Sequence, residues 1–266
     1  MILESVGINS IFVIMNGKNM ENEVREKKFV EICKAHVGDE AHNLIEDPKI
    51  NVILNDIKNY PHIFVLACLM DKQIKAERAW SIPYTICVEL CNGCFDFEAL
   101  EKLTLDQIRG VFEKEKLHRY NKPMSEVFYE AIQYIASKYN GDASRIWQGQ
   151  QSSAEIIYRF LNFKGCGIKI ASMATNLLHR NFGIKYSDYS SLDISPDIHI
   201  RRVMYRLGLI DDMDDTTQVI YRARSINPEY PGQMDECCWE IGRNFCKETN
   251  PKCSECKLDA ICMHRY

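Results

Sequence analysis

Four cysteines near the end of the printed sequence constrain the fold more than any other feature. Cys246, Cys253, Cys256 and Cys262 follow the spacing C-x6-C-x2-C-x5-C. In a chain with no secretory signal, four thiols so close together indicate ligands for iron or zinc rather than a disulfide framework. Zinc ribbons usually pair two C-x-x-C knuckles across a longer gap, and only one such pair occurs here. The spacing favours a [4Fe-4S] cluster bound by the four cysteines.

The alternative for these cysteines is a place in an apolar core. Charged residues are rarely fully buried unless they are paired, so a charged segment argues against that alternative. The segment between and beside the thiols carries five charges, on Lys247, Glu248, Lys252, Glu255 and Lys257.

Composition is that of an ordinary globular protein. With 266 residues, 46% of them hydrophobic and 26% charged, the chain suits one large domain or two modest ones, and we expect two. The apolar run Ile8–Met15 is interrupted by Asn9 and Ser10 and lacks a cationic start, so we expect neither a signal peptide nor a membrane anchor. Twelve cysteines without an export signal indicate a reducing compartment, which we take to be the cytoplasm of a prokaryotic cell, beside its DNA.

Helical periodicity dominates the chain, and no segment reads as a convincing sheet. Apolar residues recur at steps of three and four within 23–37, 63–80, 124–135 and 154–160. Thr104 and Gln107 fit a capping box, and Asp142 is placed to cap a short helix. The pattern predicts an all-α protein. The net charge of −4 gives no global footprint for nucleic acid, so any contact with DNA must be local.

Two further segments carry chemistry. The stretch from Ser153 to Asn181 reads as helix, tight hairpin and helix, with Gly165 and Gly167 at the turn. These glycines allow a sharp turn and expose amide groups at the start of the second helix, where an anion such as a phosphate is favoured. A plain helix-connecting turn is the alternative. The second segment is Ser195–Val203, in which Asp197 follows a proline and opens a helix, as an ordinary N-cap also does.

Taken in order, the G-x-G-x-Lys hairpin, the Pro-Asp-x-His-x-x-Arg-Val segment and the cysteine loop resemble the endonuclease III branch of the helix-hairpin-helix DNA glycosylases. The resemblance covers roughly residues 60–266. It implies a two-domain all-α fold, with a six-helix barrel over 61–188 that contains the hairpin at about 153–181. Residues 1–60 and 189–266 would form the helical [4Fe-4S] cluster domain.

The same resemblance implies a set of functional residues. Lys169 falls on the catalytic lysine of the family, Asp197 on its catalytic aspartate, and Gln73 on the residue that fills the gap left by an everted nucleotide. It also implies contacts to double-stranded DNA, by a monomer without membrane attachment, from the following residues: Lys164, Gly165, Gly167, Gln73, Arg202 and Lys252.

The implied activity is removal of a damaged base followed by cleavage at the abasic site. A base inside a duplex is out of reach, so such enzymes turn the nucleotide into a pocket. Lys169, as a neutral amine, would attack the sugar C1′ and form a Schiff base; burial and nearby Lys or Arg would promote loss of its proton. Asp197 would stabilise the oxocarbenium-like sugar. We expect an oxidised pyrimidine as substrate, with 8-oxoguanine or a monofunctional glycosylase as the alternatives.

Several features leave the assignment open. Lys164 stands where the family often has proline, and the stretch between Lys169 and Asp197 is longer than in endonuclease III. The segment Cys87-x3-Cys91-x2-Cys94 has the spacing of radical S-adenosylmethionine enzymes, but on one helix these cysteines share a face, as buried cysteines do. A DNA-binding protein that keeps the cluster but has no catalytic activity is the remaining rival from a different class.

Overall fold

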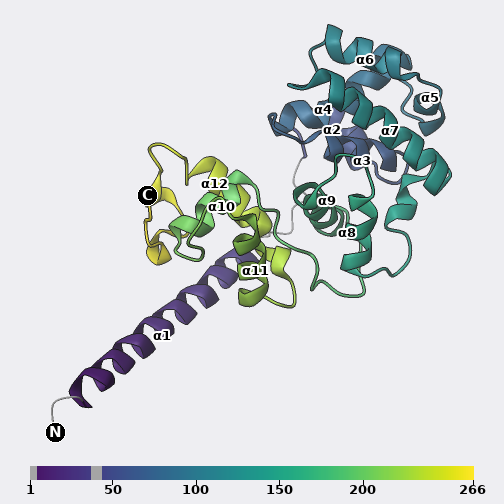
Figure 1. The fold of residues 1–266 in the computed structure, drawn as a ribbon. Helices are drawn as coiled ribbons and strands as arrows, with labels where there is room; N and C mark the ends of the chain where they lie inside the picture. The colour runs from purple at the N-terminus through teal and green to yellow at the C-terminus, as the bar shows by residue number, and fades with distance from the viewer. Residues whose placement is uncertain (1–4, 37–43) are drawn as a thin grey trace. The chain divides into compact units, whose positions relative to one another are not determined.

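The computed structural model describes residues 5–36 and 44–266, with side chains from residue 21 onward, and its described residues form helices and no strand (Figure 1). This confirms the predicted all-α class. The chain divides into two compact units, Met1–Asp39 with Asp193–Tyr266, and Glu40–Leu192. We call the first the terminal unit and the second the central unit. The expectation for the apolar run Ile8–Met15 lies outside the residues whose side chains are described.

The central unit consists of eight α-helices and one 3-10 helix among its described residues, with α3 at the centre. All ten residues of α3 are buried, and the helix packs against α4, α7 and α9. Its neighbours bury one face each and keep the other in water, as amphipathic helices do. The elements are α2 Pro48–Asn55, α3 Pro61–Met70, α4 Ala76–Leu90, α5 Phe97–Glu101, α6 Leu105–Lys114, α7 Asn121–Tyr139, η1 Ala143–Ile146, α8 Ser153–Leu161 and α9 Ile168–Arg180.

Local sequence signals set several of these boundaries. Thr104 and Gln107 form the expected capping box of α6. Asp142 accepts a hydrogen bond from the Ser144 amide at the start of η1, as predicted. The apolar periodicity over residues 63–80 predicted a single helix, but the chain breaks between α3 and α4. Gln73 adopts a left-handed φ of 56° in this break, which an α-helix cannot accommodate.

The terminal unit is built from helices near both ends of the described chain. Phe29 and Cys33 of α1 are fully buried in a core with side chains from α10, α11 and α12. Gly242 in α12 is required by close packing, because a Cβ there would lie 2.7 Å from the Cβ of His199 in α10. The elements are α1 Ser5–His36, α10 Ile198–Arg206, α11 Thr216–Ile226, η2 Pro231–Met234, α12 Asp235–Asn244, η3 Cys253–Glu255 and η4 Asp259–Ile261.

The two units divide at 39/40 and 192/193, whereas the sequence predicted boundaries at 60/61 and 188/189. The helix α2, which the sequence assigned to the cluster domain, packs against α3 and α4 of the central unit. Its buried Leu54 explains the difference, because this side chain belongs to the central core. Among the residues searched, no helix combines the length and the apolar character needed to cross a membrane.

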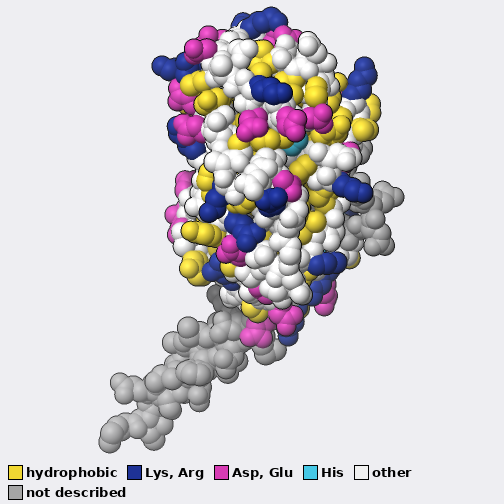
Figure 2. Space-filling view, turned by 90° about the vertical axis from the view of Figure 1, so that its right-hand side faces the viewer, with side chains coloured by type: hydrophobic (Ala, Val, Ile, Leu, Met, Phe, Trp, Pro, Cys, Tyr) yellow, Lys and Arg dark blue, Asp and Glu magenta, His cyan; other side chains and the backbone are white. Residues whose placement is uncertain are grey.

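The prediction that Cys87, Cys91 and Cys94 share one face of a helix is wrong. Helix α4 ends at Leu90, and Asn92 and Gly93 both take positive φ values, of 52° and 75°, which stop the helix. Cys87 is buried within the helix, whereas Cys94 is exposed in the following turn. On the face of the molecule shown in Figure 2, lysine and arginine side chains lie interspersed with aspartate and glutamate, in keeping with the small net charge.

Candidate active site and cysteine loop

The predicted hairpin is present in the central unit. Ser152 caps α8 by accepting a hydrogen bond from the Glu155 amide at 3.1 Å, and α8 packs against α9. Between the two helices, Phe163 is buried against Tyr134, with ring centroids 4.8 Å apart. This ring contact anchors the turn, while Lys164, Gly165 and Gly167 remain exposed.

The two hairpin glycines have different reasons to be glycine. Gly165 has a φ of +77°, and a Cβ there would lie 3.1 Å from Val127 Cγ2, so both the turn and the packing require it. Gly167 is the N-cap of α9 in an extended conformation, with open space where a Cβ would be. Of the two residues, Gly165 therefore has the backbone conformation that favours glycine. What Gly167 provides is an exposed helix start.

Lys169 lies in the first turn of α9, and its amine forms an ion pair with a carboxylate that the sequence analysis did not single out. The distance from Lys169 Nζ to Asp71 Oδ2 is 3.1 Å. The Lys169 side chain is 37% exposed and that of Asp71 is 12% exposed. We expected neighbouring cations to promote proton loss from Lys169, but its charged partner is an anion.

Two thiols lie near this ion pair. Burial raises the pKa of Cys166 to about 12. The pKa of Cys68, which is fully buried at the end of α3, is raised by burial first and then by the charge of Asp71. Both thiols are therefore neutral near pH 7 and add no charge to the pair.

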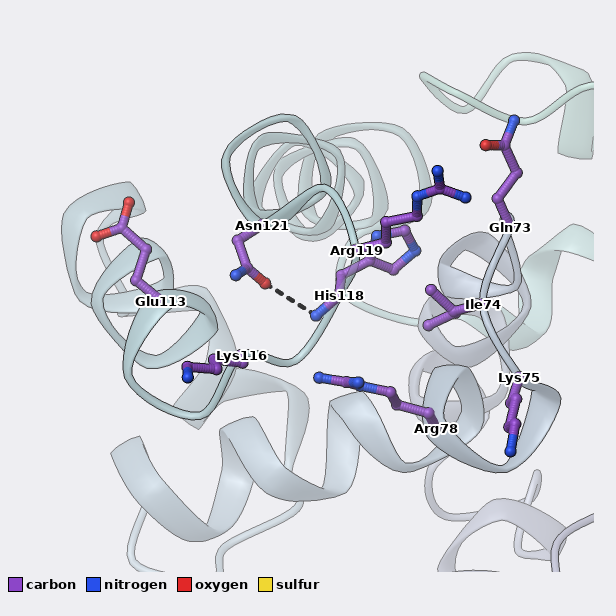
Figure 3. Close-up of a pocket in the computed structure, with 9 residues that line it drawn as sticks. All are labelled: Gln73, Ile74, Lys75, Arg78, Glu113, Lys116, His118, Arg119 and Asn121. Atoms are coloured by element: carbon purple, nitrogen blue, oxygen red, sulfur yellow. Dashed lines mark hydrogen bonds between the residues drawn. The ribbon is translucent and has the colours of Figure 1, made fainter.

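Gln73 lies on the rim of a cavity of about 740 Å³ in the central unit (Figure 3). Its Oε1 accepts a hydrogen bond from the Tyr120 hydroxyl at 2.9 Å. Four cationic residues and one carboxylate line the cavity: Lys75, Arg78, Lys116, Arg119 and Glu113. In Figure 3, Arg78 reaches toward the middle of the cavity, whereas Glu113 points away from it. The excess of positive charge suits an anionic ligand. No local sequence pattern indicates these residues, because they come from two separate segments, 73–78 and 113–121.

In the terminal unit, Asp197 is the N-cap of α10. Its Oδ1 accepts a hydrogen bond from the Ile200 amide at 2.8 Å. The residue is only half-buried, between the buried Pro196 and the exposed Ile198. The cap fixes the carboxylate at the start of the helix, beside the positive end of the helix dipole.

The predicted DNA contact of Arg202 is not supported, because the side chain is buried. Its guanidinium donates to the carbonyl oxygens of Cys246 at 2.6 Å and Gly242 at 2.8 Å. Arg206 is also buried and donates to the carbonyl of Lys247 at 2.6 Å. These two arginines of α10 hold the first part of the cysteine loop by its backbone.

The other predicted DNA contacts are exposed. Lys164 forms an ion pair with Glu130 on α7, and both side chains are about half exposed. Lys252, in the cysteine loop, lies 3.7 Å from Glu255, and both are likewise open to water. Surface pairs of this kind contribute little to stability, so either lysine is free to exchange its partner for a phosphate.

The four cysteines of the loop lie close enough to influence one another. Burial raises the pKa of Cys262, and the charges of Cys246, Cys256 and Cys253 raise it further. Ionising all four thiols together is therefore costly unless a cationic group binds them. The Tyr266 hydroxyl lies 3.2 Å from Cys253 Sγ, and Arg206 Nη1 lies 3.6 Å from Cys246 Sγ.

The four thiols lie in one loop, and thiolates are soft ligands of the kind that both zinc and iron-sulfur clusters take. Among the described residues, the potential ligands whose atoms all lie within 4.8 Å of one another are Cys253, Asp259 and His264. The donor set of the loop therefore fits a metal or an iron-sulfur group.

Comparison with solved structures identifies the fold. A trapped endonuclease III–DNA covalent intermediate, an estranged-adenine complex, matches with a TM-score of 0.55 and 17% identity over 81% of this chain and 92% of the other. A non-covalent endonuclease III–DNA complex gives 0.54, with the same identity and coverage. A thermostable thymine-DNA glycosylase gives 0.60 with 14% identity, over 91% of this chain and 97% of the other. No protein-family model matches the sequence, and no curated protein matches it significantly.

The chain therefore has the same fold as these endonuclease III and thymine-DNA glycosylase structures. This all-α, endonuclease III-like fold is the one that the resemblance implied.

Proposed function

We propose that this protein is a DNA glycosylase with an associated abasic-site lyase activity, and that it removes an oxidised pyrimidine from double-stranded DNA. The observation that carries the proposal is the position of Lys169. The residue lies in the first turn of α9, directly after a hairpin with exposed backbone, and its amine is partly open to solvent. This is the position that the family resemblance assigns to the catalytic lysine.

The proposed reaction uses two side chains. The neutral amine of Lys169 attacks C1′ of an extruded deoxyribose, the glycosidic bond breaks, and its electron pair leaves with the base. Asp197, fixed by its capping hydrogen bond, stabilises the positive charge that develops on the sugar. Ring opening gives a Schiff base, from which β-elimination cleaves the strand 3′ to the lesion.

DNA contacts are proposed from both units. In the central unit these are Lys164, the exposed amides beside Gly165 and Gly167, and the cationic cavity at Gln73. In the terminal unit the contact is Lys252. Phosphate contacts position the duplex without reading its sequence. The twelve cysteines are all free thiols, which supports action in a reducing compartment such as the cytoplasm, where we propose that the protein acts as a monomer.

Cys246, Cys253, Cys256 and Cys262 would hold a [4Fe-4S] cluster. Bound there, the cluster would supply a structural cross-link between segments of the loop. The loop itself offers Lys252 to the DNA backbone, and the buried Arg202 and Arg206 connect it to α10.

The experiment is a panel of duplexes, each with one defined lesion, assayed for base release and for strand cleavage. We expect release of an oxidised pyrimidine together with a borohydride-trapped adduct that Lys169→Ala abolishes. Release of 8-oxoguanine alone would show that this base, and not an oxidised pyrimidine, is the substrate. Release without any adduct would show a monofunctional enzyme, and binding without release would show a non-catalytic protein.

A charge test for Asp197 accompanies the panel. Serine also caps helices, so Asp197→Ser keeps the N-cap and removes only the carboxylate. We expect base release to fall by a factor on the order of 100 to 1,000 while the protein stays folded. An unchanged rate would remove Asp197 from the mechanism.

A further inference from the structure

The ion pair between Asp71 and Lys169 joins two helix ends. Asp71 follows Met70 as the C-cap of α3, and Lys169 is the second residue of α9. The two helices pack against each other although the residues are 98 positions apart in the chain. The contact is therefore a product of the tertiary fold.

Each member of the pair lies at the helix end that disfavours its charge. The C-terminal end of a helix carries partial negative charge, which repels the Asp71 carboxylate, and the N-terminal end carries partial positive charge, which repels the Lys169 ammonium. The ion pair offsets both unfavourable interactions, because each charge has an opposite charge 3.1 Å away.

The neighbouring thiols add no charge to the pair. The thiols of Cys68 on α3 and Cys166 in the hairpin are neutral near pH 7, because burial raises both of their pKa values. Lys164, the other hairpin lysine, forms its ion pair with Glu130. Among the described residues, the ion pair of Lys169 is with Asp71.

We propose that Asp71 is a positioning residue that holds the Lys169 amine in an ion pair and restrains its nucleophilic attack until the pair opens. This inference rests on the proposed lyase function of Lys169. Opening the pair lets the ammonium lose its proton to solvent. The freed lone pair then forms the bond to C1′, and the departing base takes up a proton from solvent.

The test is the rate of adduct formation at two pH values. Excess protein is mixed with a duplex that contains an abasic site, and the Schiff base is trapped with cyanoborohydride. At about pH 6.5 and at about pH 8.5 we expect Asp71→Asn to form adduct about fivefold faster than the natural protein, because both values lie below the usual lysine pKa of about 10.4. A variant that has only lost positioning of the amine would instead form adduct more slowly.

Matched variants separate this effect from damage to the fold. Asp71→Glu keeps the charge and should restore the natural pH profile. Glu89→Gln breaks a lysine–carboxylate pair elsewhere in the central unit, the 2.7 Å contact with Lys114, and should leave the profile unchanged. Thermal melting of each variant confirms that it is folded.

The outcomes distinguish this inference from the proposed function. Adduct formation by Asp71→Asn that is no faster than by the natural protein at either pH overturns the role of Asp71 and leaves the lyase proposal standing. If neither protein forms adduct at either pH, Lys169 is not a nucleophile, and both proposals fail.

Discussion

The two units of the chain are stabilised in different ways. The central unit is organised around α3, a helix buried along its whole length, and its catalytic candidate Lys169 is placed by helix packing. In the terminal unit, Leu258 is the only buried residue after Gly242, so the last segment has little apolar surface to hold it. Burial of apolar surface is the dominant stabilising term in folding. The comparison teaches that the central unit is held by its apolar core, whereas the cysteine loop depends on polar contacts such as those of Arg202 and Arg206 and on the cluster that we propose.

The largest expected effect follows from removing a cluster ligand. We expect Cys256→Ser to lose the brown colour and the bound iron and to unfold the cysteine loop, because the remaining contacts are few. Iron analysis, visible absorption and proteolysis of the C-terminal segment measure this. Cys94→Ser, which changes an exposed cysteine of the central unit, is the matched control and should keep the iron. Iron retained by Cys256→Ser, or a colourless natural protein with bound zinc, would contradict the cluster.

The features predicted from sequence are those encoded by neighbouring residues. The cysteine spacing, the capping box at Thr104 and the order of helix, hairpin and helix around Gly165 are all local patterns, and the fold class follows from them. The residues 63–80 misled the prediction, because apolar periodicity continues through a break that depends on the backbone of Gln73.

The features that sequence could not predict depend on burial and on distant contacts. Asp71 meets Lys169 only after α3 packs on α9, and nothing near either residue indicates the pairing. Arg202 looks like a DNA contact in sequence because arginines are usually exposed. Its burial follows from carbonyl groups of α12 and the cysteine loop, which lie more than 39 residues away.

The second prediction, with the next largest expected effect, tests whether the central unit depends on its apolar core. Phe163 is buried beneath the hairpin, and we expect Phe163→Ala to lower the free energy of unfolding by about 3–5 kcal/mol. Urea denaturation of the two variants measures the difference. Leu161→Ala, two residues earlier and 41% exposed, should change stability by less than about 0.5 kcal/mol. Equal effects of both substitutions would show that the hairpin is not anchored by Phe163.

A smaller effect concerns the acid stability of the central unit. Burial lowers the pKa of His62 to about 4, although the Phe95 carbonyl, which accepts its Nε2 hydrogen bond at 2.8 Å, opposes the shift. The folded state thus binds this proton less readily than the unfolded chain. The contribution of neutral His62 to the free energy of unfolding is fully present above about pH 6.5. It is lost as the pH falls toward 4, which lowers the free energy of unfolding by about 3 kcal/mol in total.

Urea denaturation between about pH 7 and about pH 4 measures this loss. We expect His62→Gln to flatten the pH dependence, because glutamine does not titrate in this range. The variant should be less stable at neutral pH, since it changes a buried side chain. A slope as steep as that of the natural protein would assign the acid sensitivity to other groups.

The smallest effect concerns the hydrogen bond between Tyr266 and the cysteine loop. A donor to a ligand sulfur stabilises the more negative, reduced state of an iron-sulfur cluster. Tyr266→Phe removes the hydroxyl that lies 3.2 Å from Cys253 Sγ but keeps the ring over which Arg206 lies at 5.0 Å, so we expect the reduction potential to fall. Tyr221→Phe is the matched control, because Arg224 lies over its ring at 5.2 Å and no hydrogen bond to sulfur is formed there. Voltammetry that gives the same potential for both variants would show that the cluster is insensitive to the Tyr266 hydroxyl.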